Sequence, residues 1–243
     1  QALDFLMDHS GSRTNLEVDF FGGEPLMNWD VVKQLVEYAR SVEKERGKNF
    51  RFTLTTNGML IDDDVIDFAN REMSNVVLSL DGRKEIHDRL RVDYAGNGSY
   101  ERIVPKFQKL VEARGNKNYY MRGTFTHANP DFTKDLFHMA DDLGFDELSM
   151  EPVVSKAGSP EALTEADHGR AAEHHDPLHH AHSGDGRVSI GPSRLIEADG
   201  SHAGKSLPGQ RRQTTLEDPQ IIIGLQFHMR KMELEIAALG AAN

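Results

Sequence analysis

The 243-residue sequence contains no cysteine, which excludes disulfide bonds, thiolate metal sites and cysteine nucleophiles from the chain as given. It also lacks any apolar run close to the ~20 residues that a membrane-spanning helix needs. Basic residues are in the minority: 28 Lys and Arg stand against 39 Asp and Glu, a net charge of -11. This balance argues against nucleic acid as the main partner, because its phosphate backbone attracts cationic surfaces. No signal peptide is recognisable, since the chain opens within a helical pattern at residues 2–7 and does not start with Met.

Apolar segments and helical patterns alternate along residues 16–154. The expected strands are 16–21, 50–55, 75–80, 119–126 and 148–154. The expected helices cover 1–9, a stretch that begins at Asn28 or Asp30, a stretch that begins at Asp62-Asp63-Asp64, 100–114 and 131–143. Three aspartates in a row favour a helix N-terminus, which explains them better than a metal site does. Five strands alternating with helices predict an α/β fold with a parallel sheet and right-handed crossovers.

The composition changes after Val154. Residues 155–212 are rich in Gly, Ser, Ala, Pro and His, and five histidines fall within positions 174–182. A histidine-rich tract can bind transition metals, but without a rigid frame such binding is usually adventitious, so we predict no metal site there. Residues 221–239 return to helical spacing and predict a C-terminal helix. We therefore divide the chain into a core, residues 1–154, and an irregular tail, residues 155–243, that ends in this helix.

Glycine and polar residues lie at the ends of the expected strands. In a parallel sheet these ends meet on one rim, where α/β proteins bind ligands. The rim offers a carboxylate for an amine, hydroxyl and amide groups for ribose, a guanidinium for a carboxylate and backbone for a base. That inventory suits an amino-acid–nucleoside ligand, although each residue alone also fits a simple turn or salt bridge. The candidate residues are Gly22, Gly23, Glu24, Pro25, Asn57, Ser79, Asp81, Arg122, Met150 and Glu151.

The order of these motifs resembles the radical S-adenosylmethionine superfamily. Its strands carry a Gly-Gly-Glu motif, a Thr-Asn-Gly turn and a Ser-x-Asp-Gly turn, which here are residues 22–24, 56–58 and 79–82. Over residues 1–154 the sequence is similar to the SPASM-type peptide maturases. Among these it most resembles the family that forms thioether cross-links in SCIFF peptides, which are small six-cysteine ribosomal precursors. The resemblance implies a partial (βα) parallel barrel, a cysteine-rich precursor peptide as partner and, with no export signal, a cytoplasmic location.

The resemblance also implies two cofactors. In this family a [4Fe–4S] cluster cleaves S-adenosylmethionine, and the 5′-deoxyadenosyl radical then abstracts a hydrogen from the substrate. The turn from Gly22 to Pro25 would hold the methionyl amine, with Glu24 as its anion. Ser79, aided by Asn57, would reach the ribose.

The remaining candidates lie on the later strands. By the same resemblance Arg122 would hold the carboxylate of S-adenosylmethionine, and the backbone around Met150 and Glu151 would flank the adenine. Asp81 lies in the same turn as Ser79 and is the candidate catalytic residue facing the substrate, with a purely structural turn residue as the alternative.

The sequence departs from the family where the cluster should be held. Iron–sulfur clusters need cysteine thiolates, and this chain has none. The C-x3-C-x2-C loop of the family should precede residue 1, and the SPASM cysteines should follow residue 154. We therefore expect a fragment that is inactive as given, with a non-homologous tail from residue 168. Loss of a first strand would leave an unpaired sheet edge at residues 16–21 or at the neighbouring strand, which predicts marginal stability or association.

Two other functions stay open at this point. The first is a cluster-free module that binds a peptide or S-adenosylmethionine without chemistry. The second is an unrelated βα-barrel hydrolase or isomerase with Glu24, Asp81 and Glu151 as acid–base groups, although the glycine motifs give it no support.

Overall fold

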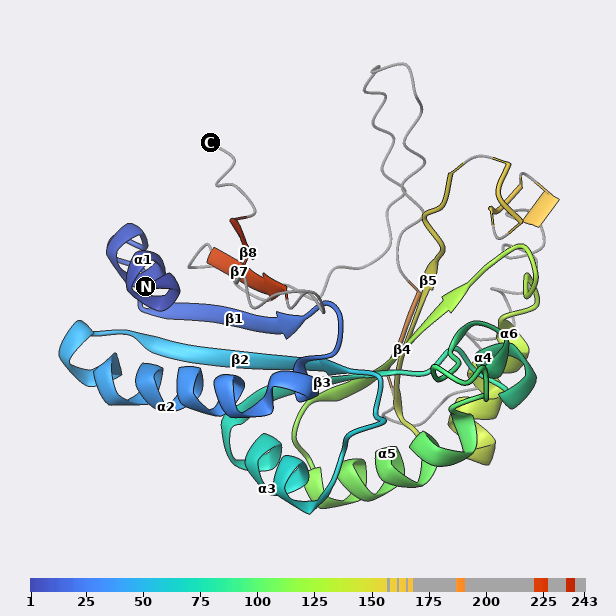
Figure 1. The fold of residues 1–243 in the computed structure, drawn as a ribbon, viewed down its shortest axis with the longest axis horizontal. Coiled ribbons are helices and arrows are strands. Elements are labelled where there is room, and N and C mark those ends of the chain that lie inside the picture. The colour runs from blue at the N-terminus through green and yellow to red at the C-terminus, as the bar shows by residue number, and fades with distance from the viewer. Residues whose placement is uncertain are drawn as a thin grey trace.

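The computed structural model describes residues 1–156, 158–160, 162–164 and 166–167, and the backbone of three further strands between residues 187 and 238. Its centre is a curved sheet of parallel strands. The long helices lie along one face of this sheet (Figure 1). The fold is therefore the predicted α/β architecture, a partial parallel barrel.

Five parallel strands form the middle of the sheet, and helical structure follows each of the first four. The strands are β1 (Asn15–Phe21), β2 (Asn49–Thr56), β3 (Met73–Ser79), β4 (Tyr119–Phe125) and β5 (Glu147–Pro152). The α-helices are α1 (Ala2–His9), α2 (Trp29–Arg46), α3 (Asp63–Glu72), α4 (Lys84–Leu90), α5 (Tyr100–Arg114) and α6 (Thr133–Phe137). A 3₁₀ turn, η1 (Pro25–Asn28), precedes α2, and a π-helical turn, η2 (His138–Asp142), extends α6. In the sheet, β1 to β5 lie side by side in chain order.

Alternation along β1 and β2 separates the two faces of the sheet. Leu16, Val18 and Phe20 are at most 1% exposed and belong to the core that the helices cover. Phe20 stacks against Phe52 of β2 with ring centroids 5.8 Å apart. Fully burying each such side chain stabilises the fold by roughly 1.5–3 kcal/mol. Because strand side chains alternate, the residues between them, beginning with Glu17, face the opposite, concave side.

Local sequence explains most of the helix boundaries. Asp62 caps α3, because its carboxylate accepts a hydrogen bond from Val65 N at 3.0 Å, so the acidic run is a helix start. Among the residues described, no group of acids or histidines could hold a metal ion. The predicted helix 131–143 is divided into α6 and η2. Helix α4 was not predicted, because its only buried residue is His87 and it has no apolar stripe.

The predicted C-terminal helix at 221–239 is wrong. Two strands form there instead: β7 (Ile221–Gln226) pairs parallel with β1, and β8 (Glu235–Ala238) pairs antiparallel with β7. Three consecutive β-branched isoleucines favour an extended backbone, and the edge of β1 offers unpaired amide and carbonyl groups. The expected open edge at β1 is wrong for the same reason, since Leu16 to Phe21 pair with Ile221 to Gln226.

The rest of the tail contributes one further strand to the described structure. Strand β6 (Arg187–Ile190) pairs parallel with β5, and the histidine tract at 174–182 lies outside the described residues. The division at residue 154 stays a prediction.

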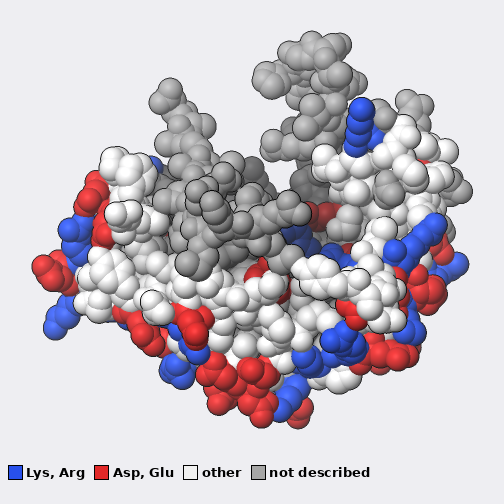
Figure 2. Space-filling model, viewed as in Figure 1, with Lys and Arg blue, Asp and Glu red and all other residues white. Residues whose placement is uncertain are grey.

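None of the described helices combines the length and the apolar character that crossing a membrane requires. Figure 2 shows acidic and basic side chains interspersed over the outer helices in this view.

Candidate functional site

The turn after β1 is built by two glycines and a buried glutamate. Gly22 and Gly23 have φ angles of 79° and 58°, a region that favours glycine. Glu24 follows and is only 7% exposed. Its Oε1 accepts hydrogen bonds from Leu26 N at 3.1 Å and Thr56 Oγ1 at 2.8 Å, and its Oε2 accepts one from Asn57 N at 2.7 Å. The Glu24 carboxylate therefore joins the ends of β1 and β2.

The charge of Glu24 is balanced only by dipoles in the described part of the chain. Burial raises the pKa of this carboxyl, and the hydrogen bonds from Asn57, Thr56 and Leu26 oppose the rise. No lysine or arginine among the described residues pairs with it. A cationic amine placed against the Gly22-Gly23 backbone would complete the site, because a buried carboxylate is stabilised most by a charged donor.

The turn after β2 is held by its own side chains. Thr56 Oγ1 accepts a hydrogen bond from Gly58 N at 3.1 Å, and Asn57 Oδ1 accepts one from Met59 N at 3.0 Å. Gly58 has a φ of +81°, and a Cβ there would lie 2.3 Å from Phe107 Cε1. These contacts stabilise the turn, so the Thr-Asn-Gly sequence has a structural role whether or not it also contacts a ligand.

The turn after β3 is fixed by a buried ion pair that the sequence did not reveal. Asp81 is 3% exposed and accepts hydrogen bonds from Arg91 Nε at 2.5 Å and Arg91 Nη2 at 3.0 Å. It also accepts a hydrogen bond from Thr124 N of β4 at 2.9 Å. His87, which is fully buried, accepts a hydrogen bond from Asp81 N at 3.3 Å and contacts Ser99 Oγ at 2.9 Å. These contacts favour a structural role for Asp81, and its catalytic role stays a prediction.

Arg122 lies beside the candidate ribose contact. Ser79 ends β3 and is paired in register with Arg122 of β4. Arg122 Nη2 lies 2.5 Å from Oε2 of Glu151 on β5, and the two side chains are 45% and 40% exposed. The Met150 side chain is fully buried, and a Cβ on Gly123 would lie 2.3 Å from its sulfur. The whole residue is therefore buried, and the contact of its backbone with a ligand stays a prediction.

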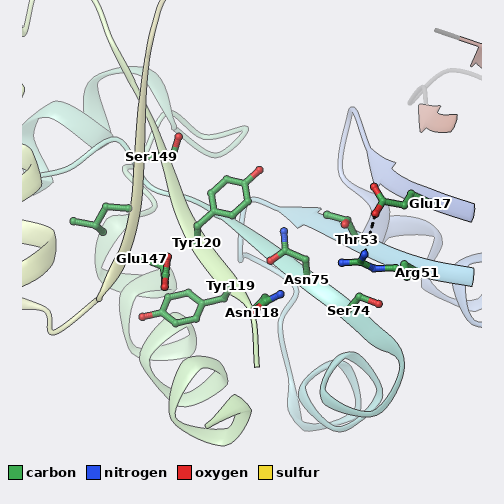
Figure 3. Close-up of a pocket in the computed structure, with 11 residues that line it drawn as sticks. Glu17, Arg51, Thr53, Ser74, Asn75, Asn118, Tyr119, Tyr120, Glu147 and Ser149 are labelled. Carbon is green, nitrogen blue, oxygen red and sulfur yellow. Dashed lines mark ion pairs between the residues drawn. The ribbon is translucent and has the colours of Figure 1, made fainter. Parts of the chain in front are cut away.

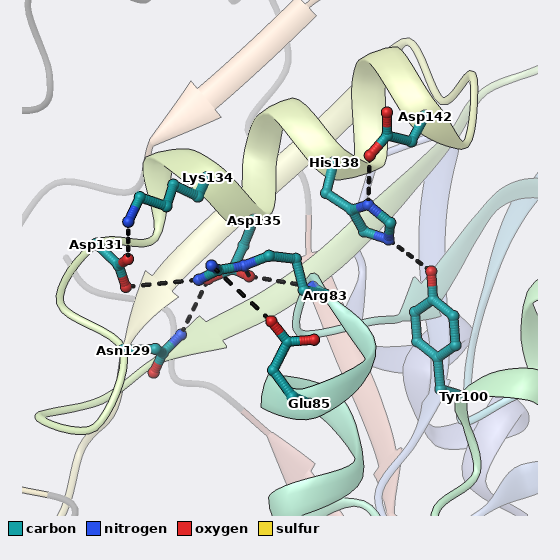
Figure 4. Close-up of polar contacts among 9 residues, drawn as sticks. All are labelled: Arg83, Glu85, Tyr100, Asn129, Asp131, Lys134, Asp135, His138 and Asp142. Carbon is teal, nitrogen blue, oxygen red and sulfur yellow. Dashed lines mark hydrogen bonds and ion pairs between the residues drawn. The ribbon is translucent and has the colours of Figure 1, made fainter.

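A polar network behind the β3 turn also escaped prediction (Figure 4). Asp135 of α6 is fully buried and accepts hydrogen bonds from Arg83 N at 3.0 Å and Arg83 Nε at 2.7 Å. Asn129 and Asp131 complete its surroundings, with Arg83 Nη2 at 3.5 Å from Asp131 Oδ1. Arg83 and Asp135 are 52 positions apart, so no local pattern joins them.

Below the rim, the concave face of the sheet is polar. A cavity of about 540 Å³ opens there toward the amino ends of the strands (Figure 3). Glu17 and Arg51 form an ion pair of 3.5 Å in its wall. Further lining residues on neighbouring strands are Thr53, Asn75, Tyr120, Glu147 and Ser149.

The predicted rim residues thus meet in two groups. The structure brings Glu24 and Asn57 into direct contact, and it places Ser79 beside Arg122 and Arg122 on Glu151. Asp81 lies in the same turn but points its carboxylate at Arg91.

The chain is similar to known proteins over most of its core. Residues 13–149, more than half of the chain, match the model of the Radical SAM superfamily. The chain is 33% identical over 97 residues to a cysteine-type anaerobic sulfatase-maturating enzyme of Clostridium novyi, covering 40% of this chain and 26% of that protein. It is 26% identical over 122 residues to the radical SAM cyclopropyl synthase TigE of Paramaledivibacter caminithermalis, covering 48% of this chain and 24% of that protein. The chain therefore spans about a quarter of the length of the curated relatives it matches.

Solved structures show the same fold. Native anSMEcpe with bound AdoMet and Kp18Cys peptide superposes with a TM-score of 0.60 at 22% identity, over 70% of this chain and 48% of that one. Streptococcus suis SuiB superposes with a TM-score of 0.57 at 16% identity, over 80% of this chain and 42% of that one.

Proposed function

The chain belongs to the radical SAM superfamily, and we propose that it is the S-adenosylmethionine-binding core of an enzyme that modifies a peptide. The observation that carries this proposal is the turn of Gly22, Gly23 and Glu24. It presents a buried carboxylate next to two glycines whose backbone a ligand can approach closely. The relatives support the peptide as substrate class, because they include sulfatase-maturating enzymes and a solved structure that contains a bound peptide.

The residues on the rim fit S-adenosylmethionine. Glu24 suits the methionyl amine, because it is buried and its described partners are all neutral donors. Arg122 suits the methionyl carboxylate, since a guanidinium binds carboxylates through paired hydrogen bonds. Ser79, its neighbour in register, offers a hydroxyl for the ribose, and the backbone at Met150 and Glu151 lies one strand further on.

The residues of this chain do not fit an iron–sulfur cluster. Such clusters are held by cysteine thiolates, and the 243 residues include none. The described part of the chain also contains no cluster of three histidines or acids that could bind a metal ion instead. We therefore assign to this chain the binding and positioning of ligands only.

The finer proposal concerns the product. By the resemblance of residues 1–154, we propose that the parent enzyme forms thioether cross-links in a cysteine-rich ribosomal peptide, and that this chain is a fragment of it. The alternative is a cluster-free module that binds S-adenosylmethionine or a peptide without chemistry. The absence of cysteine is the observation that favours the alternative.

Calorimetric titration of the chain with S-adenosylmethionine tests the shared part of both readings. We expect saturable one-to-one binding that Glu24→Gln weakens by about 1–3 kcal/mol, the cost of losing a charge-assisted hydrogen bond. Ser79→Ala should weaken it by about 0.5–1.5 kcal/mol through a neutral hydrogen bond. Glu37→Gln, on an exposed position of α2, is the matched control. A titration of the wild-type chain with S-adenosylmethionine that shows no heat of binding, neither released nor absorbed, would contradict the proposal.

A second experiment separates the two readings. A defined cysteine-rich peptide is offered to the parent gene product and to this chain under anaerobic conditions with iron and sulfide. A thioether product from the parent alone supports the fragment. The cluster-free binding module is supported if this chain binds the peptide tightly and the whole gene encodes no cysteine ligands for a cluster.

A further inference from the structure

Asp19 is a partly buried carboxylate, and its Oδ1 has no hydrogen-bond partner among the described residues. It lies on β1 between Val18 and Phe20, which are in the core, so its side chain faces the concave side of the sheet. Its Oδ1 is inaccessible to solvent and lacks a hydrogen-bond partner. Burial raises the pKa of Asp19 to about 6, with Arg122 opposing the rise and Glu17 adding to it. At pH 7.5 the group is therefore mostly an ionised carboxylate whose Oδ1 lacks a donor.

The cations near Asp19 are held by other carboxylates. Arg122 lies 2.5 Å from Glu151, and Arg51 lies 3.5 Å from Glu17. Arg122 acts on Asp19 through its charge, but among the described residues both arginines form their ion pairs with other acids. Burying a charged group without a partner is costly, so a purely structural position would be better served by an uncharged residue.

The position of Asp19 lies between the ligand rim and the cavity. Gly22 lies three positions further along the chain, which is about 10 Å at the rise of a β-strand. It is paired in register with Thr53, and both Thr53 and Glu17 line the cavity of about 540 Å³ on the amino-terminal side. Figure 3 shows Thr53, Tyr120 and Asn75 in this hollow. A group that extends inward from the rim therefore passes Asp19 before it reaches the cavity.

We propose that Asp19 is a substrate-contacting residue whose carboxylate accepts a hydrogen bond from a proton-bearing group of the peptide. This inference rests on the proposed function, because it takes the concave face as the place where the peptide meets S-adenosylmethionine. The donor is an N–H of the peptide backbone or the S–H of a cysteine, and an ionised, partly buried carboxylate can accept a hydrogen bond from either. Asp19 thus fixes how deep the peptide enters, while the rim residues fix S-adenosylmethionine.

The test is peptide binding by the full chain in saturating S-adenosylmethionine at pH 7.5. The probe is the N-acetylated, C-amidated heptapeptide Ala-Gly-Ala-Cys-Ala-Gly-Ala, titrated to millimolar concentration and followed by NMR. We expect Asp19→Asn to raise the Kd of the probe at least tenfold and to leave the Kd of S-adenosylmethionine within twofold of wild type. Glu37→Gln, exposed on α2, should change neither value. Thermal unfolding of both variants verifies that they are folded.

Two further probes identify the donor. Probes with Ser or Ala in place of Cys separate the two sources: an unchanged effect of Asp19→Asn with the Ala probe assigns a backbone N–H, and an effect confined to Cys and Ser assigns the side chain.

Equal probe affinity in wild type and Asp19→Asn would overturn the inference, as would a wild-type chain that binds no probe. A parallel loss of S-adenosylmethionine binding in Asp19→Asn would also overturn it, because Asp19 would then act on the rim. If the wild-type chain fails to bind S-adenosylmethionine, the result counts against the proposed function and not against the role of Asp19.

Discussion

The ion pair between Arg83 and Asp135 should be one of the costliest to break in this fold. Asp135 is fully buried, Arg83 is 24% exposed, and Asp135 accepts hydrogen bonds from the backbone and the side chain of Arg83. Removing one partner of a buried pair costs about 3–5 kcal/mol, because the other charge is left unpaired. Arg83 retains Asp131 at 3.5 Å, so we place Asp135→Ala at the lower end, about 3 kcal/mol.

A double-mutant cycle measured by urea denaturation tests this estimate. Asp135→Ala, Arg83→Ala and the double variant should give a coupling energy of about 2 kcal/mol or more between the two side chains. Lys134→Ala is the matched control: its pair with Asp131 is exposed and is worth at most about 1 kcal/mol. Additive effects of the two alanine substitutions would refute the reasoning. So would a loss of less than 1 kcal/mol in Asp135→Ala, on the scale of an exposed pair.

Three more predictions follow from buried groups. Burial lowers the pKa of His87 from 6.5 to about 4. The contribution of this group to the free energy of unfolding is therefore fully present above pH 6.5, and it is lost as pH falls toward 4. The loss should reach roughly 3 kcal/mol at 1.36 kcal/mol per pKa unit, and His87→Gln should flatten this slope in urea titrations at pH 4, 5.5 and 7.5. The raised pKa of Asp19 acts in the opposite sense, giving stability below pH 4 that is lost as pH rises through 6. Asp19→Asn should therefore add about 1–2 kcal/mol at pH 7.5, after allowance for its partial exposure, and nothing at pH 4. Gly58→Ala should lower the free energy of unfolding by about 2–3 kcal/mol, since its Cβ would meet Phe107 and its φ is positive; an unchanged thermal midpoint would contradict this.

The sequence predicted the parts of the fold that depend on local pattern. Strand β1 and helix α5 have strong apolar periodicity and were located to within a residue. The 221–239 segment shows why pattern alone fails elsewhere. Its apolar residues have helical spacing, but the free edge of β1 is a partner that only the folded sheet supplies.

The candidate site divides in the same way. Glu24 was recognised because a glycine pair and an acid stand together in the sequence, and the structure places it on Thr56 and Asn57 of the next strand. Arg91, which fixes Asp81, was missed because arginines at a helix end carry no signal of their partner. Asp19 was missed because a single acid in an imperfectly alternating strand is indistinguishable from a solvated one until its burial is known.

The two ends of the rim differ in how much they must change when a ligand arrives. Glu24 is held by three hydrogen bonds and is buried, so its position is set before binding and little ordering cost remains. Arg122 is different, because it is 45% exposed and its pair with Glu151 is equally accessible to water. An exposed pair of this kind contributes at most about 1 kcal/mol, so a ligand carboxylate can displace Glu151 at small cost. We therefore expect Glu151→Gln to leave the affinity for S-adenosylmethionine unchanged or slightly improved, whereas Arg122→Gln should weaken it by about 1.5–3 kcal/mol. A Glu151→Gln variant that loses affinity as strongly as Arg122→Gln would show that Glu151 binds the ligand itself.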